Sequence, residues 1–323
     1  MEPGAIYDFG LLVVGLAILV KGADLLVGGA SCVASRLGIP SMVIGLTVVS
    51  FGTSLPEMIV TLVSGLRGNP DLAIANVIGS NIANVLLILG VAAIIRPLPV
   101  TDSTVFSEIP FSLTAALLVG FLANAALFSA RPVLTISHFD GAILLFFFFL
   151  FMLYVYRVSR TRKVPDEPAL PQRTVARSSL YIVLGVTALY FGGRWVVDGA
   201  VGIATALGVD DAVIGLTIVA IGTSTPELVA SAVAAWRGQT DIAVGNVVGS
   251  NIFNLLWVLG LTSTIVELPF EVVSNTDLLM VIAASTMVLL AMVVSRKNAV
   301  MRWHGVVFVL CYLAYLAFVV QRG

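Results

Sequence analysis

The sequence contains two motifs twice, 170 positions apart, and this duplication constrains the fold more than any other feature. The segment GLTVVSFGTSLPE (Gly45–Glu57) recurs as GLTIVAIGTSTPE (Gly215–Glu227). The segment RGNPDLAIANVIGSNIAN (Arg67–Asn84) recurs as RGQTDIAVGNVVGSNIFN (Arg237–Asn254). Two long matches at one offset do not arise by chance, so the chain consists of two related halves.

The composition places both halves in a membrane. Hydrophobic residues make up 59% of the chain and charged residues 11%, and the mean hydropathy is +1.06. Soluble domains carry about 25% charged residues. The 17 basic and 18 acidic residues balance, which gives no footprint for a nucleic acid. Cys32 and Cys311 are too far apart in the chain to indicate a disulfide framework or a zinc site. We predict an all-α polytopic membrane protein without a cofactor.

Ten apolar segments are long enough to be transmembrane helices, which need about 20 residues to cross the hydrocarbon core. They lie near residues 7–35, 40–66, 71–95, 104–127, 138–157, 177–206, 211–235, 241–265, 276–295 and 302–320. The first and sixth are the longest, which predicts strong tilt or extension beyond the membrane surface.

A hydrophilic linker with three prolines, residues 158–176, separates a first repeat (1–157) from a second repeat (177–323). Each repeat holds five spans, and an odd number means that the second repeat enters the membrane in the opposite orientation. Inverted repeats are typical of transporters with a substrate site near the midplane. The distribution of Lys and Arg predicts a cytoplasmic linker and both termini outside, in the cell (inner) membrane.

The motif Gly52–Glu57 predicts a break inside the second span. Pro56 has no amide hydrogen, and its ring clashes with the carbonyl of Gly52. The helix is therefore expected to kink or unwind and to leave carbonyl oxygens near Ser50 to Gly52 without partners. Such carbonyls are tolerated at membrane depth only where protein or a water-filled cavity surrounds them.

The same motif carries oxygen ligands. The hydroxyls of Thr53 and Ser54 lie one helical turn before the carboxylate of Glu57. Hydroxyl, carbonyl and carboxylate oxygens together suit a hard cation such as Na⁺ or Ca²⁺. The second half repeats these residues as Thr223, Ser224 and Glu227.

A buried structural carboxylate is the alternative interpretation of both glutamates. However, no Lys or Arg lies within nine residues of Glu57 or Glu227 to neutralise it, and an intramembrane acid is functional by default. We therefore predict that both glutamates bind cations.

The second motif, Asn76–Asn84 and its copy Asn246–Asn254, lies within the third and eighth spans. Its polar side chains could coordinate an ion or hydrogen-bond between helices. For Asn76 and Asn81 both interpretations remain open. Coordination is favoured for the four residues Ser80, Asn84, Ser250 and Asn254.

Two further pairs of intramembrane charges indicate structure rather than binding. Lys21 and Asp24 are three residues apart, and Arg194 and Asp198 are four apart. Each pair is predicted to neutralise itself along its own helix.

GTSLPE and GTSTPE, each followed by GSNI and arranged around a central linker, resemble the two alpha repeats of the sodium/calcium exchanger family. This family belongs to the cation/calcium exchanger superfamily, and the layout is similar to its compact prokaryotic members. The resemblance implies that the second, third, seventh and eighth helices frame the cation sites. It also implies that the long first and sixth helices slide against the others. The glycines at 28–29 and 192–193 would suit such a sliding face, but packing explains them equally well.

The resemblance implies specific ligands. A central divalent site would use Glu57 and Glu227 with the carbonyls of Thr53 and Thr223. Flanking sodium sites would use the carbonyls of Ser50 and Ala220 and the hydroxyls of Ser54, Ser224, Ser80 and Ser250. Asn84 corresponds to a position that is often Asn. Asn254 stands where potassium-dependent relatives, and some prokaryotic ones, have Asp, and this departure argues against potassium co-transport.

The sequence thus predicts a secondary antiporter that exchanges Na⁺ for Ca²⁺ and works as a monomer in the bilayer. Ca²⁺/H⁺ exchange through the same glutamates is the alternative. A channel would conduct without a counter-ion. An intramembrane protease would need a base near Ser54 or Ser224, but His138 and His304 lie near span ends.

Overall fold

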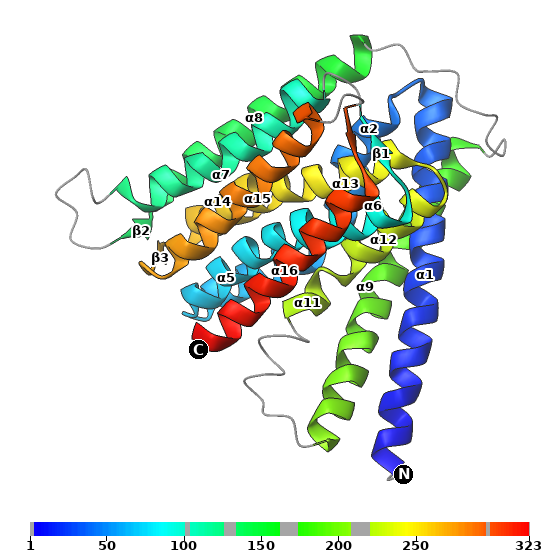
Figure 1. The fold of residues 1–323 in the computed structure, drawn as a ribbon, viewed down its shortest axis with the longest axis horizontal. Coiled ribbons are helices and arrows are strands. Elements are labelled where there is room, and N and C mark those ends of the chain that lie inside the picture. Colours follow the sequence, from blue (N-terminus) through cyan, green and yellow to red (C-terminus); the bar gives the residue numbers. More distant parts are fainter. Residues whose placement is uncertain are drawn as a thin grey trace.

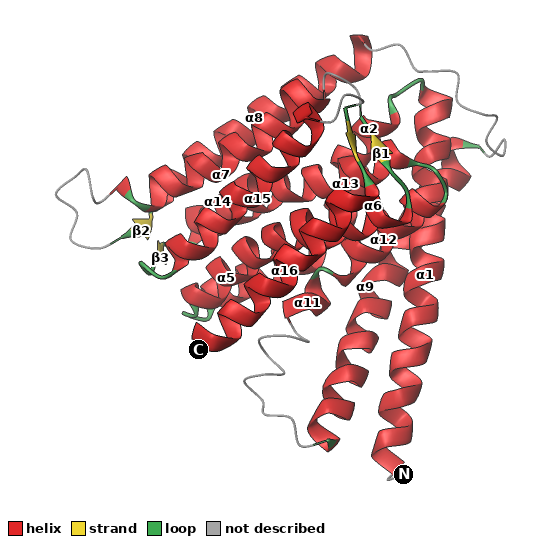
Figure 2. Ribbon diagram, viewed as in Figure 1, coloured by secondary structure: helices red, strands yellow, loops and turns green. Residues whose placement is uncertain are grey.

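The computed structural model describes residues 3–100, 104–125, 134–161, 174–207, 220–294 and 298–322. Helices dominate these segments, as Figure 2 shows, and the predicted all-α class is confirmed. The helices form one bundle, with the long helices α1 (Pro3–Leu37) and α9 (Val175–Ala206) along one side (Figure 1).

Eight helical spans of the described residues are long and apolar enough to cross a membrane. The pair Ser41–Thr53 and Leu55–Leu66, bent by 48° at the break between them, is a ninth candidate. The eight are α1, α5 to α6 (Pro70–Ile95), η3 to α7 (Thr104–Ala123), α8 (His138–Thr161), α9, α13 to α14 (Thr240–Ile265), α15 (Ser274–Val294) and α16 (Arg302–Arg322). The predicted seventh span begins within residues 208–219, outside the described residues, and continues as α11 (Ala220–Thr223) and α12 (Thr225–Trp236). The count of ten therefore stays a prediction.

The duplication extends to local structure. In the first half, the second and third spans consist of α2 (Ser41–Ile44), η1 (Gly45–Val49), α3 (Ser50–Thr53), α4 (Leu55–Leu66), α5 (Pro70–Ile82), η2 (Ala83–Ile88) and α6 (Leu89–Ile95). In the second half, the same boundaries return 170 residues later in α11, α12, α13 (Thr240–Ile252), η6 (Phe253–Val258) and α14 (Leu259–Ile265). The η segments are π-helical, and a further one, η3 (Thr104–Glu108), precedes the α-helix α7 (Ile109–Ala123).

Two short antiparallel ladders lie at opposite ends of the bundle (Figure 1). β1 (Leu98–Pro99) pairs with β4 (Ala299–Val300), and β2 (Thr135–Ile136) pairs with β3 (Leu268–Pro269). β1 and β3 are counterparts in the duplication, and an inverted repeat requires that they lie at opposite ends.

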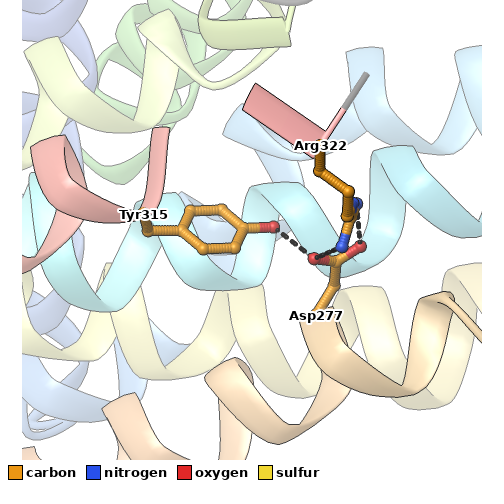
Figure 3. A network of polar contacts seen from close by, with 3 residues as sticks. All are labelled: Asp277, Tyr315 and Arg322. Atoms are coloured by element: carbon orange, nitrogen blue, oxygen red, sulfur yellow. Dashed lines mark hydrogen bonds and ion pairs between the residues drawn. The ribbon is translucent and has the colours of Figure 1, made fainter. Parts of the chain in front are cut away.

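The last two helices are tied together by a polar cluster at the C-terminal end of α16 (Figure 3). The Asp277 carboxylate accepts hydrogen bonds from the Tyr315 hydroxyl at 2.9 Å and from both terminal nitrogens of Arg322 at 3.0 Å. A bidentate pair of this kind fixes geometry as well as charge, so it anchors the end of α16 against the start of α15.

The centre of the bundle is formed by the duplicated spans. In their most apolar windows, 94% of the α13–α14 residues and 72% of the α5–α6 residues are buried, against 22% in α9 and in α16. α4 packs on α5, and α12 packs on α13. Any group on the inner faces of α4 and α12 is therefore shielded from lipid and from water.

α1 and α9 pack against each other through glycines spaced seven residues apart. Gly15, Gly22 and Gly29 of α1 face the backbone of α9. A Cβ at Gly22 would lie 3.0 Å from the Gly185 carbonyl oxygen, and a Cβ at Gly185 would lie 2.6 Å from the Leu26 nitrogen. Gly29 and Gly192 thus pack the two helices together, whereas a Cβ at Gly193 would meet Pro226 of α12 at 3.5 Å.

Replacing Gly22 by Leu is expected to force α1 away from α9, because no Cβ fits against the α9 backbone. Overpacking of this kind costs about 1–3 kcal/mol of unfolding free energy. Thermal unfolding in detergent measures it. Gly10→Leu is the matched control, because a Cβ there has no neighbour within 4 Å. Equal stability of the two variants would contradict the close packing.

Candidate cation site

Both motif helices break at the serine of the GTS sequence. Ser54 has φ −85° and ψ 8° between α3 and α4, and Ser224 has φ −87° and ψ 5° before α12. Pro56 and Pro226 follow in the first turns of α4 and α12. Proline is tolerated there because first-turn amides have no partner within the helix. The predicted break in the second span is confirmed.

The prediction that carbonyls near the break lack partners was wrong for Ser50. Its carbonyl accepts the Ser54 amide at 3.0 Å and the Thr53 hydroxyl at 3.3 Å. The ladder of α3 continues as far as Ser54, because the chain breaks two residues after Gly52. The Ser50 hydroxyl donates to the Leu46 carbonyl at 2.8 Å.

The serine at each break donates to the carboxylate of the opposite half. The Ser54 hydroxyl lies 2.9 Å from Oε1 of Glu227, and the Ser224 hydroxyl lies 3.3 Å from Oε1 of Glu57. The exposed fraction is 0% for Glu57 and 1% for Glu227. Each carboxylate lies in the first turn of its helix, where the positive end of the helix dipole stabilises negative charge. The two halves thus meet at a pair of buried, crossed acid–serine contacts.

The asparagines of the second motif lie on π-helical segments that pack against these first turns. Asn84 is on η2, which packs on α12, and Asn254 is on η6, which packs on α4. Both are buried, and Asn84 donates its amide to Asn251 Oδ1 at 3.0 Å. π-Helical turns inside α-helices are frequent at functional sites.

The remaining predicted ligands lie on the surrounding helices. Ser80 on α5 and Ser250 on α13 are buried. A Cβ at Gly249, next to Ser250, would lie 2.7 Å from the Ser50 hydroxyl, so α13 contacts α3 directly. Thr53 on α3 is fully buried, and Thr223 on α11 is half-buried. Ala220 is the first residue of α11, and its side chain lies outside the described part.

Several buried oxygens of the two motifs have no hydrogen-bond partner among the residues that the structure describes. They are Oε2 of Glu57 and of Glu227, Oδ1 of Asn81, Asn84 and Asn254, and Oγ of Ser250. A buried polar group without a partner costs about 1–3 kcal/mol. A hard cation satisfies carboxylate, amide and hydroxyl oxygens together.

The donor set disfavours a transition metal. The described residues contain no group of three or more His, Cys, Asp or Glu side chains that could hold a metal ion. Two carboxylates among neutral oxygens suit Na⁺ or Ca²⁺ rather than ions that prefer imidazole or thiolate.

Asn76 and Asn246 connect neighbouring helices through hydrogen bonds. Asn76 donates to the Glu57 carbonyl at 3.1 Å and to the Thr61 hydroxyl at 2.9 Å. Asn246 donates to the Ser231 hydroxyl at 2.9 Å and accepts from the Thr53 hydroxyl at 3.1 Å. Thr61 and Ser231 occupy matching repeat positions, and this pairing of hydroxyls is the sequence signal for the contact.

Asn81 remains compatible with both interpretations. Its amide donates to the Val77 carbonyl at 2.6 Å, whereas its Oδ1 is among the oxygens without a partner.

The outer charge pairs follow the prediction in one case. Arg194 and Asp198 pair along α9 at 3.7 Å. Asp24 pairs instead with Arg237 at the end of α12, because that helix ends against α1. His138 and His304 lie in the first turns of α8 and α16, as predicted.

Asn246→Ala is expected to lower the unfolding free energy by about 1–3 kcal/mol, because it removes the hydrogen bond to the buried Ser231 hydroxyl and one of the two hydrogen bonds of the Thr53 hydroxyl. Thermal unfolding in detergent checks this. Asn76→Ala removes the equivalent contacts in the other half and should cost a similar amount. A stability loss in only one of the two variants would contradict the symmetric role.

Comparison with known proteins identifies the family of the chain. The sequence model described as "Sodium/calcium exchanger protein" matches residues 7–157 and 177–321. The chain is 39% identical over 264 residues to the inner membrane protein YrbG of Escherichia coli, covering 79% of each. It is 33% identical to the sodium/calcium exchanger MaX1 of Methanosarcina acetivorans, covering 96% of this chain and 97% of that one.

Solved structures agree as well. A structure of the sodium-calcium exchanger NCX_Mj, soaked with Na⁺ and Ca²⁺, matches with a TM-score of 0.79 and 31% identity, covering 96% of this chain and 97% of that one. The duplicated motifs, the bundle and these matches lead to one conclusion: the chain belongs to the sodium/calcium exchanger family of membrane transporters.

Proposed function

We propose that the chain exchanges Na⁺ for Ca²⁺ across the membrane by alternating access, with Glu57 and Glu227 as the charged ligands of the transported ions. Family membership makes it a cation/calcium antiporter rather than an enzyme. The observation that carries the proposal is the pair of fully buried carboxylates, one from each half, each with one oxygen held by a serine and one oxygen free of hydrogen bonds.

The resemblance to the exchanger family supplies the remaining proposed ligands. In the central divalent site the carbonyls of Thr53 and Thr223 complete the two carboxylates. In the flanking sodium sites the ligands are the carbonyls of Ser50 and Ala220 and the hydroxyls of Ser54, Ser224, Ser80 and Ser250. The Ser50 carbonyl would have to give up one of its two hydrogen bonds to take that role. Asn84 and Asn254 contribute amide oxygens, and the partnerless Oδ1 atoms of both support that role.

Charge explains why exchange is coupled. Two carboxylates in a site without water carry a large desolvation cost, which cations offset. Without bound cations the site is strongly negative, so the conformational change that exposes it to the other face is unfavourable. One Ca²⁺ or several Na⁺ neutralise the site and allow this change. Na⁺ and Ca²⁺ therefore compete for Glu57 and Glu227. After one kind of ion is released on one face, the other kind must bind there before the site can return.

The packing of the long helices supports the moving part of this cycle. The glycine contacts make α1 and α9 one unit, and that unit touches the site through Pro226. Sliding of the α1–α9 unit past α4 and α12 would open the site to one face at a time. We place both termini outside and the linker 158–176 in the cytoplasm. We place the protein in the inner membrane, because the relative YrbG is named an inner membrane protein. A single chain holds both carboxylates, which supports a functional monomer.

Sodium coupling is separable from proton coupling by flux in proteoliposomes. With equal pH on both sides, an imposed Na⁺ gradient should drive Ca²⁺ uptake. A pH gradient without Na⁺ should drive little. The reverse pattern would establish Ca²⁺/H⁺ exchange at the same two glutamates.

Glu57→Gln and Glu227→Gln should each abolish Na⁺-driven Ca²⁺ uptake, because each removes one of the two charges facing the divalent ion at nearly constant volume. Glu267→Gln, the same change at an exposed position, should transport normally. Thermal unfolding verifies that the variants are folded. A Glu57 or Glu227 variant that transports at the rate of the unmodified protein would refute the two-carboxylate site.

Asn254→Asp should strengthen Ca²⁺ binding several-fold, because it adds a third carboxylate next to two others. Calcium titration in detergent at fixed pH measures the change. Asn124→Asp, the same substitution at the C-terminal end of α7, is the control. Unchanged or weaker binding in the Asn254 variant would remove this residue from the ligand set.

A further inference from the structure

A cavity of about 190 Å³ lies between α9 and the broken segments that carry the glutamates. Pro56 and Pro226, which adjoin Glu57 and Glu227 in the chain, line it together with Thr223. Its wall on α9 is formed by Tyr190, Gly193, Arg194, Val197 and Asp198. The cavity thus reaches the site from the α9 side, while the carboxylates themselves stay buried.

The wall of the cavity on α9 carries two exposed charges, Arg194 and Asp198. Arg194 and Asp198 lie in the C-terminal half of α9, within the sixth span predicted from the sequence (177–206). Their side chains are 66% and 52% exposed. Exposed charges within a membrane span would cost a few kcal/mol each against lipid, which favours an aqueous crevice around this pair.

The ion pair in the crevice is loose. The Arg194 Nε to Asp198 Oδ2 distance is 3.7 Å, longer than the 2.7–3.2 Å of a normal N–H···O hydrogen bond. Exposed i,i+4 pairs contribute only about 0.3–0.5 kcal/mol. A cation that reaches Asp198 therefore displaces Arg194 at little cost.

We propose that this crevice is the access route for hydrated Na⁺ and Ca²⁺ from one face, with Asp198 as the first carboxylate they meet and Arg194 as its resting counter-ion. Asp198 lies nearer than Arg194 to the C-terminal end of α9, the end predicted to face outside, so an ion from that side reaches the carboxylate first. The inference rests on the proposed exchange and adds a recruiting position outside the buried site.

The corresponding charge on α1 is held differently. Asp24 pairs with Arg237 at the end of α12, across two helices. Among the described residues, Asp24 of α1 is thus tied to the end of another helix, α12. Asp198 of α9 pairs only within its own helix and lines the cavity.

Recruitment by one carboxylate predicts a specific relation between the two ions. The energy of an ion in a given potential scales with its charge. The local enrichment of Ca²⁺ is therefore the square of the enrichment of Na⁺. Salt screens exposed charges, with a Debye length of about 10 Å at 0.1 M ionic strength.

The test is sided transport by the full-length protein in liposomes, with KM for Ca²⁺ measured from each face in choline chloride. For Asp198→Asn we expect KM for Ca²⁺ to rise about threefold from the α9 C-terminal face. KM for Na⁺ should rise by about the square root of that factor, and both effects should fade at high ionic strength. Asp198→Glu should restore KM, and Arg194→Gln should lower it.

Glu271→Gln is the matched control, because Glu271 is an exposed acid on the face predicted to be outside and does not line the cavity. If the unmodified protein exchanges ions but Asp198→Asn leaves KM unchanged, or raises it equally from both faces, the access role is refuted. If Asp198→Asn does not fold, an unchanged KM in Arg194→Gln refutes it instead. If the unmodified protein exchanges no Ca²⁺ for Na⁺ at all, the proposed function itself fails.

Discussion

Two carboxylates, Glu57 and Glu227, are buried side by side in the centre of an apolar bundle, and they repel each other wherever both are charged. Crossed hydrogen bonds from Ser224 and Ser54, together with two helix N-termini, offset part of that repulsion. The break in each helix places a helix N-terminus next to the carboxylates in the middle of a span, which an unbroken helix could not do. In the proposed function the transported cations supply the remaining positive charge, so the stability of the site would depend on its occupancy.

The duplication follows from the same requirement. Each half contributes one carboxylate, one serine that reaches the opposite carboxylate, and one π-helical asparagine. Neither half can build the site alone. The central helices α5 and α13 are therefore buried, and Asn76 and Asn246 fix them to the segments that carry the glutamates. The α1–α9 unit packs beside these helices and contacts α12.

Sequence reasoning reached the parts of the site that depend on local chemistry. Proline and glycine act within one helical turn, so the position of the break and the residues around it could be predicted from the motif. The crossed partners of Ser54 and Ser224 could not, because they depend on how two distant segments are placed. The π-helical turns at Asn84 and Asn254 depend likewise on packing against α12 and α4. The Ser50 carbonyl and the Asp24–Arg237 pair were mispredicted because each partner is set by where a helix ends.

The account is tested most directly by locating the bound divalent ion. A crystal of the protein grown with Sr²⁺, a heavier analogue of Ca²⁺, can be measured at a wavelength where strontium scatters anomalously. We expect one dominant peak between Glu57 and Glu227, at roughly the 2.3–2.6 Å from their carboxylate oxygens that Ca²⁺ takes, and its loss when Na⁺ replaces Sr²⁺. A dominant peak away from both glutamates, or one that excess Na⁺ leaves unchanged, would contradict the account.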